Sequence, residues 1–353
     1  MRILFVGESW LGSCARSLKE ALTRQPGVDL DEVNEDLFFP KHQAKWVRGI
    51  NRLLRGTYKR ELERQVLDRI SAFEPDFVIT YKGFPLDARI LGRLRGMRTC
   101  LVNIYPDYSP HAYGEQHRKA VGQYDLVIST KPFHPAIWRE TYGYSNPCLF
   151  VPQGYDPALH LVAAPQEAPR FDVTLVATWR PEYGELIKQL GKLLDEKVTV
   201  GIGGAGWSAH RADYPAHWEF PGALQGRSYV NWLRQGRICV APVTRDVLIN
   251  GTHQPGDEDT TRTYELAAAH CFFIHRRTGY VRTLYDEAGE VPMYDTPDEL
   301  CAKIERYRDD ARERERMATN AHRRAVPAYS LDGRAARIVE ILREFRQANA
   351  NRQ

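Results

Sequence analysis

The stretch GDEDTTRTYELAAAHCFFIH, residues 256–275, decides the fold of this chain. Asp259 and Thr260 both favour the position just before a helix, so a helix is predicted to begin here and to run through Tyr264. The apolar run CFFIH follows at once and predicts a buried strand. A helix that leads directly into a buried strand is part of a βα unit, from which parallel sheets are built.

The same alternation of short apolar runs and longer amphipathic stretches extends over the whole chain. The expected strands are 3–6, 77–80, 100–104, 126–129 and 148–151 in the first half, and 173–177, 198–202, 238–242 and 271–275 in the second half. Each half is therefore predicted to be a doubly wound α/β domain around a parallel sheet.

The boundary between the two halves is marked by composition. Residues 151–170 contain four prolines and a glycine without periodicity, which is typical of a linker. We expect an amino-terminal domain over residues 1–160 and a carboxyl-terminal domain over 161–330. A final helix, near residues 331–346, is expected to cross back onto the first domain.

Composition excludes several classes of protein. The 353 residues are 43% hydrophobic, enough for a core in each domain, and 49 Lys+Arg against 45 Asp+Glu give a net charge of +4. No uninterrupted apolar run approaches the roughly 20 residues of a membrane span. The start, MRILFVGES, predicts a strand rather than a signal peptide, so a cytoplasmic location is expected. The six cysteines never form C-x-x-C, which argues against a zinc site or a redox pair.

Loops that follow strands are the places to search for a site, because ligands of doubly wound sheets bind beyond the carboxyl ends of the strands. In the second half, GIGGAGW at 201–207 has no G-K-[ST], which excludes a P-loop. Its Gly203, Gly204 and Gly206 still permit close approach of a ligand to the backbone. In the first half, Gly12 of GESWLGS at 7–13 allows a tight turn before a helix.

A nicotinamide cofactor is disfavoured. The loop at 7–13 is not G-x-G-x-x-G, and residues 29–31 do not close a clear second strand.

The helix start near residue 260 suits a diphosphate, because its free N–H groups and dipole favour an anion. Arg262 would add a fork-shaped cation, and Glu265 could accept hydrogen bonds from a pair of ribose hydroxyls. The alternative is that Arg262 and Glu265 form a surface ion pair of little energetic value. Spacing alone favours this alternative.

Several segments together resemble a known family. RTYELAAAHCFFI (262–274) followed by LYDEAGEVPMYDTPDELCAKIERY (284–307), the linker VPQGYDP (151–157), FEPDFVITYKG (73–83) and FPGAL (220–224) resemble CgeB-type, spore maturation glycosyltransferase-like proteins within family 4. The resemblance covers nearly the whole chain. It implies a GT-B fold, with two Rossmann-like domains facing each other across a cleft, and the activity of a glycosyltransferase.

The resemblance also implies roles for individual residues in binding a nucleotide-diphosphate sugar. Glu265 would bind the ribose and Arg262 the phosphate, and Arg180 would contact the diphosphate, although Arg180 precedes rather than follows its Pro-Glu pair. The remaining donor-side residues would be Gly203, Gly204 and Gly206 in the nucleotide cleft, Gly222 and Ala223 near the base, and Asp257 eight positions before Glu265. Asp257 is shorter than the family's usual glutamate, and His270 replaces a glycine, which suggests a wider helix end.

No metal cofactor is expected. Negative charge that develops on the leaving diphosphate would be stabilised by Arg180, Arg262 and the helix start. Asp257 and Asp259 flank Glu258 in a polar loop, where aspartates are usually solvated, and binding of a divalent ion by this loop is a minor alternative.

The acceptor is expected in the first domain, after the strand at 100–104. Asp107, His111 and His117 follow this strand, and Gly12 lies in a neighbouring strand-end loop. An inverting enzyme would need Asp107 or His111 as a base that deprotonates an acceptor hydroxyl. In a retaining enzyme, which the family resemblance implies, these residues would only position the acceptor.

Residues 41–60 form a basic amphipathic pattern. Seven cations and no acid alternate with apolar residues at helical spacing, which is typical of a helix on an anionic membrane surface. A core helix with a basic outer face is about as probable. The first interpretation predicts peripheral contact with the inner face of the cytoplasmic membrane and a lipid-linked or otherwise anionic acceptor. Binding of nucleic acid is not expected, because the aromatic residues of this patch lie on its apolar face.

The sequence therefore favours a metal-independent glycosyltransferase that moves a sugar to a hydroxyl acceptor in polysaccharide or glycolipid synthesis. Two alternatives remain open. One is a nucleotide-sugar epimerase on the same fold, which needs no acceptor. The other is a non-catalytic subunit that binds a nucleotide sugar.

Overall fold

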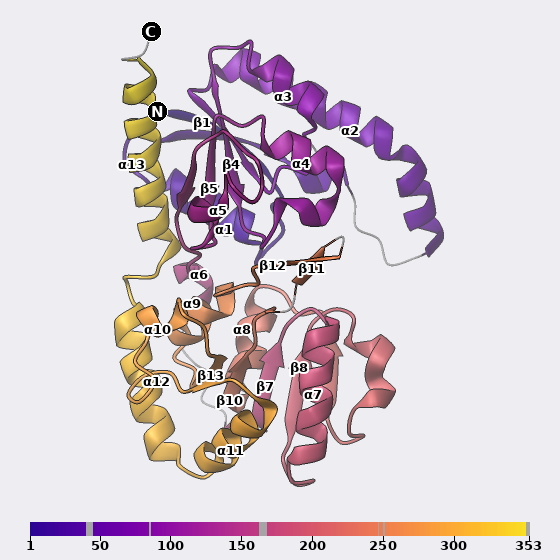
Figure 1. Cartoon of the computed structure of the whole chain (residues 1–353), viewed down its shortest axis with the longest axis vertical. Coiled ribbons are helices and arrows are strands. Elements are labelled where there is room, and N and C mark those ends of the chain that lie inside the picture. The colour runs from indigo at the N-terminus through magenta and orange to yellow at the C-terminus, as the bar shows by residue number, and fades with distance from the viewer. Residues whose placement is uncertain (40–44, 85, 162–167, 246, 250, 351–353) are drawn as a thin grey trace. The chain divides into compact units, whose positions relative to one another are not determined.

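The computed structural model describes residues 1–350 apart from 40–44, 85, 162–167, 246 and 250, and at 45–52, 55 and 350 it describes the backbone without the side chains. The chain divides into two compact units (Figure 1). The first comprises Met1–Pro152, Ile249–Thr252 and Arg334–Gln353, and the second comprises Gln153–Leu248 and His253–Gly333. Each unit is described by itself.

The first unit is built on a six-stranded parallel sheet in the order β2-β1-β3-β4-β5-β6. Its strands are β1 (Arg2–Gly7), β2 (Asp29–Asn34), β3 (Phe77–Tyr81), β4 (Cys100–Tyr105), β5 (Leu126–Ser129) and β6 (Cys148–Phe150). The order reverses between β1 and β3, and such a switch point is where ligands bind in folds of this type.

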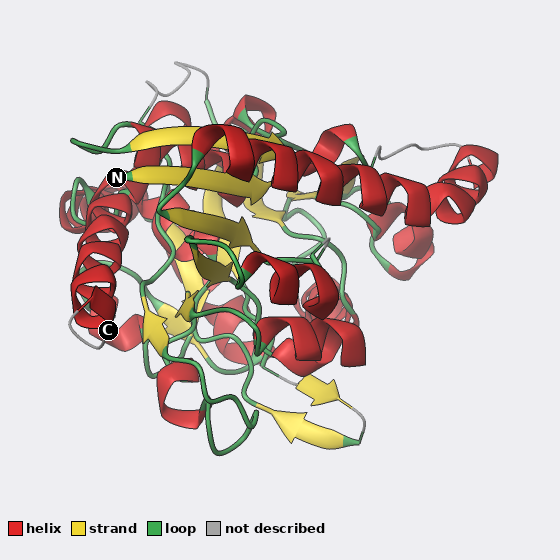
Figure 2. Cartoon of the chain, turned by 90° about the horizontal axis from the view of Figure 1, so that it is seen from above, coloured by secondary structure: helices red, strands yellow, loops and turns green. Residues whose placement is uncertain are grey.

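Helices connect the strands of the first unit. They are α1 (Cys14–Thr23), α2 (Lys45–Phe73), α3 (Ala88–Leu94), α4 (Glu115–Val121), α5 (His134–Ile137) and α13 (Leu331–Ala350), with 3-10 turns η1 (Glu35–Leu37) and η2 (Pro110–Tyr113). The long helix α2 packs over β1 and β2, as Figure 2 shows. The last turns of α13 are fixed to this unit by Arg346, whose Nη1 lies 3.0 Å from Oδ1 of Asp76.

The second unit repeats the architecture. Its parallel sheet has the order β14-β13-β10-β7-β8-β9, with β7 (Phe171–Val176), β8 (Val200–Gly203), β9 (Glu219–Gly222), β10 (Gly236–Ala241), β13 (Phe273–Arg276) and β14 (Met293–Tyr294). The short strands β11 (Val247–Ile249) and β12 (Thr252–Gln254) pair with each other. The helices are α6 (Pro157–His160), α7 (Pro181–Leu193), α8 (Arg227–Arg234), α9 (Thr261–Ala268), α10 (Val281–Leu284), α11 (Pro297–Arg308) and α12 (Ala311–Ala325), with the 3-10 segment η3 (Trp207–Asp213).

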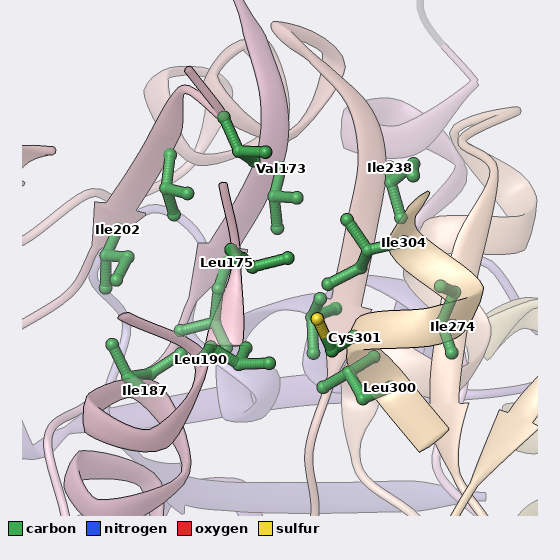
Figure 3. Packing of buried hydrophobic residues seen from close by; sticks show 14 of the residues in the cluster. Val173, Leu175, Ile187, Leu190, Ile202, Ile238, Ile274, Leu300, Cys301 and Ile304 are labelled. Atoms are coloured by element: carbon green, nitrogen blue, oxygen red, sulfur yellow. The ribbon is translucent and has the colours of Figure 1, made fainter. Parts of the chain in front are cut away.

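The core of the second unit explains why its central strands are largely apolar. Strand side chains such as Val173, Ile202 and Ile238 pack against Leu190 of α7 and Ile304 of α11 (Figure 3). A parallel sheet covered by helices has no solvated face, so its central strands read as continuous apolar runs. These are the runs by which the sequence predicted the central strands.

Three of the four edge strands were not predicted, and the expectation that residues 29–31 form no clear strand was wrong. The fourth edge strand, β6, was expected at 148–151. β2 has the sequence DLDEVN and pairs in parallel with β1, from Arg2↔Asp29 to Gly7↔Asn34. An edge strand is only half covered and needs little apolar character. The edge strands β9 and β14, of four and two residues, were missed for the same reason.

The expected linker at 151–170 contains a short helix. Asp156 caps α6, since its side chain accepts a hydrogen bond from the N–H of Ala158 at 2.9 Å. Residues 162–167 lie outside the described part of the chain. Among the helices that the structure describes, every one is too short or too polar to span a bilayer.

Candidate functional site

Glycines connect the loops at the carboxyl ends of β7, β8 and β9. The backbone of Gly204 has φ +128°, and a Cβ at this position would lie 1.9 Å from the carbonyl oxygen of Ala177. The N–H of Gly204 donates to the carbonyl of Gly222 at 2.7 Å, and the N–H of Ala177 donates to that of Gly203 at 3.0 Å. Only glycine fits at residue 204, so this rim of the sheet is a surface of backbone groups.

The other residues predicted near this rim are more exposed. Arg180 is the N-cap of α7 and is exposed, with Pro181 in the first turn. Gly206 and Gly222 both have positive φ, and no atom lies within 4 Å of a Cβ built at Gly222. Ala223 is exposed. These residues therefore stay accessible from solvent within the second unit.

The start of α9 is fixed to β13. Thr260, one of the two predicted candidates, is the N-cap, and its N–H donates to Oγ1 of Thr263 at 3.1 Å. Oγ1 of Thr263 lies 2.8 Å from Nε2 of His275, whose Nδ1 lies 2.7 Å from the carbonyl of Arg276. Burial lowers the pKa of His275 to about 4, so the ring is neutral, donates from Nδ1 and accepts the Thr263 hydroxyl at Nε2.

Arg262 connects two strand ends. Its Nη1 donates to the carbonyl of Val176 at 3.3 Å, and its Nη2 donates to that of Pro242 at 2.8 Å. Nε is buried and has no hydrogen-bond partner among the described residues. Arg262 therefore fixes the carboxyl ends of β7 and β10 to α9, and its charge lies at the strand ends where the sequence predicts the diphosphate.

Glu265 lies between two side chains that the sequence did not indicate. The hydroxyl of Tyr229, on α8, donates to Oε2 of Glu265 at 2.6 Å. Nε2 of His160, on α6, lies 3.7 Å from Oε1. Burial and the Glu265 charge raise the pKa of Tyr229 well above its usual value, so the hydroxyl keeps its proton. The carboxylate predicted to bind ribose is thus held in one orientation.

The acidic loop before α9 is more ordered than its composition suggests. The N–H of Asp257 donates to the carbonyl of Thr244 at 2.7 Å. Arg245 and the N–H of Tyr280 both bind the Glu258 side chain, the latter at 3.1 Å. The expectation that the aspartates are solvated was wrong for Asp259, which is fully buried.

Asp259 accepts the Tyr264 hydroxyl at 2.5 Å. The partner Tyr264 lies on α9, so the burial of Asp259 depends on how α9 packs against the loop. The composition of the loop alone does not predict this packing.

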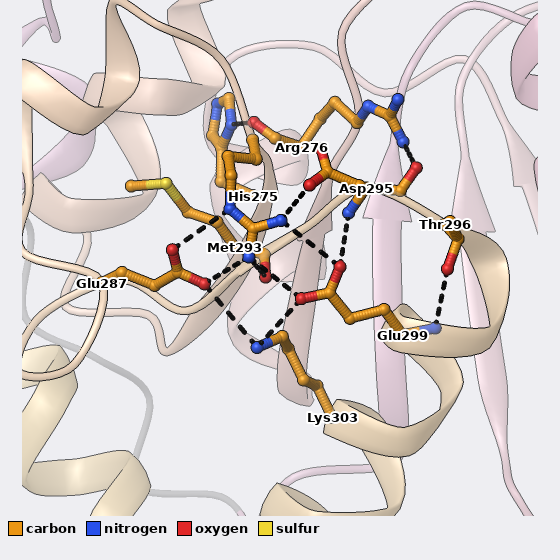
Figure 4. A network of polar contacts seen from close by, with 9 residues as sticks. His275, Arg276, Glu287, Met293, Asp295, Thr296, Glu299 and Lys303 are labelled. Atoms are coloured by element: carbon orange, nitrogen blue, oxygen red, sulfur yellow. Dashed lines mark hydrogen bonds and ion pairs between the residues drawn. The ribbon is translucent and has the colours of Figure 1, made fainter.

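An ion-pair network follows β13 and supports this end of the sheet (Figure 4). Nη2 of Arg277 lies 2.6 Å from Glu287 and 3.0 Å from Glu299, and Asp295 also binds this guanidinium. Nζ of Lys303 lies 3.4 Å from Glu299. The hydrogen bond from Arg277 lowers the pKa of Glu299 to about 2.

In the first unit, polar groups gather beyond the carboxyl end of β4. Both ring nitrogens of the buried His117, the Tyr105 hydroxyl, Oδ2 of Asp107 and Nε2 of His111 are buried without a hydrogen-bond partner among the described residues. Burial lowers the pKa of His117 to about 4 against the opposing charge of Asp107. Buried polar groups normally find partners, so these four residues are suited to bind a polar ligand or water.

Aromatic rings lie beside His117. The Phe84 and Tyr113 ring centroids are 4.7 and 5.6 Å from that of His117. Gly12 lies on the loop after β1, where its φ of +92° makes the turn before Ser13, whose Oγ accepts from the N–H of Arg16 at 3.1 Å. The predicted acceptor-side residues thus lie on the loop after β1 and on the segment after β4 that includes η2 and α4.

The predicted basic helix is described in part. Lys41 and the side chains of residues 45–52 and 55 lie outside the described residues. Leu53 is 86% exposed and Leu54 42%, whereas Leu62 and Val66, further along α2, are fully buried. Nζ of Lys59 lies 2.6 Å from Asp87. The described part of α2 therefore changes from an exposed apolar turn to a core helix.

Comparison with known proteins agrees with this architecture. Residues 180–340 match a family model described as glycosyl transferase-like. No curated protein sequence matches the chain. The matched residues include α9 with Arg262 and Glu265, and the resemblance to CgeB-type proteins in particular stays a prediction.

Solved structures with the same architecture include sucrose-phosphate synthase from Thermosynechococcus elongatus, at 12% identity and a TM-score of 0.69, covering 99% of this chain and 100% of the other. Anabaena HepE in complex with UDP-glucose gives 14% identity, a TM-score of 0.69, and 98% and 100% coverage. AviGT4, a glycosyltransferase involved in avilamycin A biosynthesis, is 15% identical to this chain, with a TM-score of 0.62 and coverage of 98% of each chain.

At these identities the structural likeness establishes the fold, and the family model concerns the carboxyl-terminal half. The chain therefore has the GT-B fold, and its residues 180–340 match the glycosyl transferase-like family model.

Proposed function

We propose that the chain is a glycosyltransferase that moves a sugar from a nucleotide-diphosphate sugar to a hydroxyl group of an acceptor. One observation carries the proposal. Glu265 is a carboxylate held between Tyr229 and His160, one turn into a helix that starts at the carboxyl ends of β7 and β10. A fixed pair of carboxylate oxygens beside a helix start suits a ribose joined to a diphosphate.

Residue roles follow from this arrangement. Glu265 accepts the ribose hydroxyls, and Gly203, Gly204 and Gly206 offer backbone contact without side-chain obstruction. Gly222 and Ala223 lie on the rim near the base. The start of α9 and the exposed Arg180 face the diphosphate, while Asp257 lies beside them for the sugar. The charge of Arg262 favours binding of the anion, and its hydrogen bonds to the carbonyls of Val176 and Pro242 fix the ends of β7 and β10.

The transfer needs charge stabilisation at the leaving diphosphate. Arg180, the helix start and Arg262 supply it without a metal ion, and this proposal predicts full activity after treatment with a chelator. We place the acceptor near Asp107, His111 and His117 of the first unit, with retention of the anomeric configuration. NMR of the product anomer tests the configuration, and an inverted product would instead require Asp107 or His111 as a base.

The experiment on the donor site compares two variants of similar chemistry. Glu265→Gln removes the charge at the proposed ribose contact, and Glu305→Gln removes one from exposed α11. Calorimetric titration with UDP, GDP and dTDP should show binding to the unaltered chain and to Glu305→Gln, and strong loss in Glu265→Gln. Equal binding by both variants would reject the site. Conversion of donor to an epimer without acceptor would reject transfer.

A membrane-facing acceptor belongs to the same proposal. Leu53 and Leu54 are exposed on α2 within a basic stretch, a pattern suited to peripheral contact with anionic lipid and to a lipid-linked acceptor in glycolipid or polysaccharide synthesis. Vesicles with acidic lipid should sediment the chain at low salt, and Leu53→Ser with Leu54→Ser should reduce sedimentation. Neutral vesicles are the control. Equal sedimentation of the double variant would reject this surface.

A further inference from the structure

A cavity lies at the amino-terminal end of the second sheet, away from the proposed donor site. It has a volume of about 300 Å³ and is lined by the starts of β10 and β13 and by the first turns of α12. β10 runs from Gly236 at this cavity toward Pro242, whose carbonyl binds Arg262. At about 3.3 Å per residue, the cavity is roughly 20 Å from the donor end of the same strand.

Three guanidinium groups line this cavity: those of Arg234, Arg237 and Arg314. Arg314 donates to the carbonyls of Tyr307 and Arg308 at the end of α11, and Arg234 donates to the carbonyl of Ala269 at the end of α9. These bonds orient the two guanidinium groups. Arg237, by contrast, has a carboxylate partner in Asp172, at 3.1 Å.

The charges of this group are close enough to affect one another. The pKa of Arg314 is lowered, first by burial and then by the neighbouring charge of Arg237, against the opposing charges of Asp310, Asp309 and Asp172. Among the described lining residues one is acidic, Glu315, and its side chain is 71% exposed. Capping of helix ends explains Arg234 and Arg314 singly, and the ion pair with Asp172 explains Arg237. Neither contact explains why like charges gather around open space.

We propose that this arginine cavity binds a small phosphate-bearing molecule, either inorganic phosphate or the phosphate monoester of a sugar-sized compound. Guanidinium forks match the oxygens of a phosphate group, and orientation by backbone carbonyls means that little side-chain entropy is lost on binding. The volume is at the lower end of the range for ligand sites, which limits the occupant to a small molecule. Phe272 and Ala318 supply an apolar wall for the remainder of an ester.

Three successive residues of α12 provide the test. Arg314 and Glu315 line the cavity, whereas Arg316 does not and pairs with Glu313 at 2.7 Å. The full chain is titrated calorimetrically with inorganic phosphate and with glucose 6-phosphate at constant ionic strength. Arg314→Gln should weaken binding about tenfold, Glu315→Gln should tighten it about threefold, and Arg316→Gln should change it less than twofold.

The expected changes in affinity have opposite signs for Arg314→Gln and Glu315→Gln. They therefore distinguish binding in this cavity from binding at the donor end, because an anion bound about 20 Å away would respond similarly to both substitutions. Arg237→Gln provides a second loss of charge, in case Arg314→Gln fails to fold without its contacts to α11. Arg314→Lys should restore part of the affinity. Tighter binding of glucose 6-phosphate identifies the ester as the preferred ligand, and equal binding identifies the phosphate group itself.

Three results would overturn the proposal. One is the absence of any binding by the unaltered chain at millimolar phosphate. The second is an equal effect of Arg316→Gln and Arg314→Gln, which would indicate unspecific screening. The third is unchanged affinity in both Arg237→Gln and Arg314→Gln when both variants fold.

Discussion

The two sheets have the same architecture, but the polar groups at their carboxyl ends differ in their hydrogen-bond partners. In the second unit, Glu265 is bound by Tyr229, and Arg262 is bound by the carbonyls of Val176 and Pro242. In the first unit, His117 and Tyr105 have buried polar atoms without hydrogen-bond partners among the described residues. The Glu265 carboxylate and both Nη atoms of Arg262 are thus bound by protein groups, although Nε of Arg262 has no partner among the described residues. Beyond β4, by contrast, several side chains present unpaired polar atoms that a ligand or water could bind.

This difference has an energetic meaning. A satisfied network holds its groups in place before a ligand arrives, so less of the binding free energy is lost in ordering them. A buried polar group without a partner costs about 1–3 kcal/mol, which a suitable ligand or water recovers. The proposed function therefore predicts that donor binding costs little ordering at Glu265, and that an acceptor stabilises the first unit when it binds. Four predictions test this contrast.

Glu265→Gln should have the largest effect. Loss of the charge weakens two hydrogen bonds to ribose, and the amide can also turn its NH₂ toward Tyr229, so we expect kcat/KM for the donor to fall about 100- to 1000-fold. Steady-state kinetics with a UDP-sugar measure it, with Glu305→Gln as the control. A loss smaller than fivefold would mean that the donor end is not organised around this carboxylate.

The second prediction concerns pH and His117. Burial lowers its folded-state pKa to about 4, below the value of about 6.5 in an unfolded chain, so the unfolded state takes up a proton first as the pH falls. This group's contribution is therefore present above pH 6.5 and is lost as the pH falls toward 4.

The loss for His117 is at most about 3 kcal/mol over this interval. Urea unfolding of the unaltered chain and of His117→Gln at pH 7 and pH 4.5 measures it. The variant should lose less stability than the unaltered chain, and parallel losses would show that His117 is not buried as described.

Arg277→Met should destabilise the second unit by about 2 kcal/mol at pH 7, because the partly buried Glu287 and Glu299 lose their nearest cation and keep the more distant Lys303. The pKa of Glu299 is depressed to about 2, so the contribution of the pair is present above pH 4.5 and is lost as the pH falls toward 2. Denaturant unfolding should therefore show a smaller effect of Arg277→Met at pH 3. Arg306→Met is the control, and an effect that is equal at both pH values would contradict the electrostatic explanation.

Asp107→Asn should show the smallest effect and the sharpest contrast. If the polar groups of the first unit await an acceptor, KM for the acceptor should rise about tenfold, while the free energy of unfolding stays the same or increases slightly. Donor hydrolysis without acceptor should be unchanged. Kinetics and urea unfolding of one preparation give both numbers, and a variant that is strongly destabilised would show that Asp107 is part of the scaffold instead.

Sequence predicted the fold through its central strands. β1, β3, β4 and β5 of the first sheet and β7, β10 and β13 of the second contain short apolar runs, and each was located to within two residues. The cap at Thr260 was also predicted, because capping is decided by residues next to each other in the chain. The edge strands β2 and β9 were not, since half-covered strands carry no comparable apolar signal.

The candidate site was predicted in part. Glu265 was indicated by its place near a helix start, but its partners were not, because Tyr229 is 36 residues away and His160 lies in a segment that resembles a linker. No local sequence pattern predicts such partners. The sequence likewise did not show that both Nη atoms of Arg262 bind strand-end carbonyls, a contact that requires α9 to lie against β7 and β10.

By itself, the sequence determined where the chain is apolar, where helices can begin and where glycine is required, since these properties depend on a residue and its near neighbours. The tertiary structure alone decided which side chains meet: Tyr229 with Glu265, Tyr264 with Asp259, and three arginines around one cavity. These residues come close only when the sheets and helices pack. The spacing of the residues along the chain therefore does not predict the contacts.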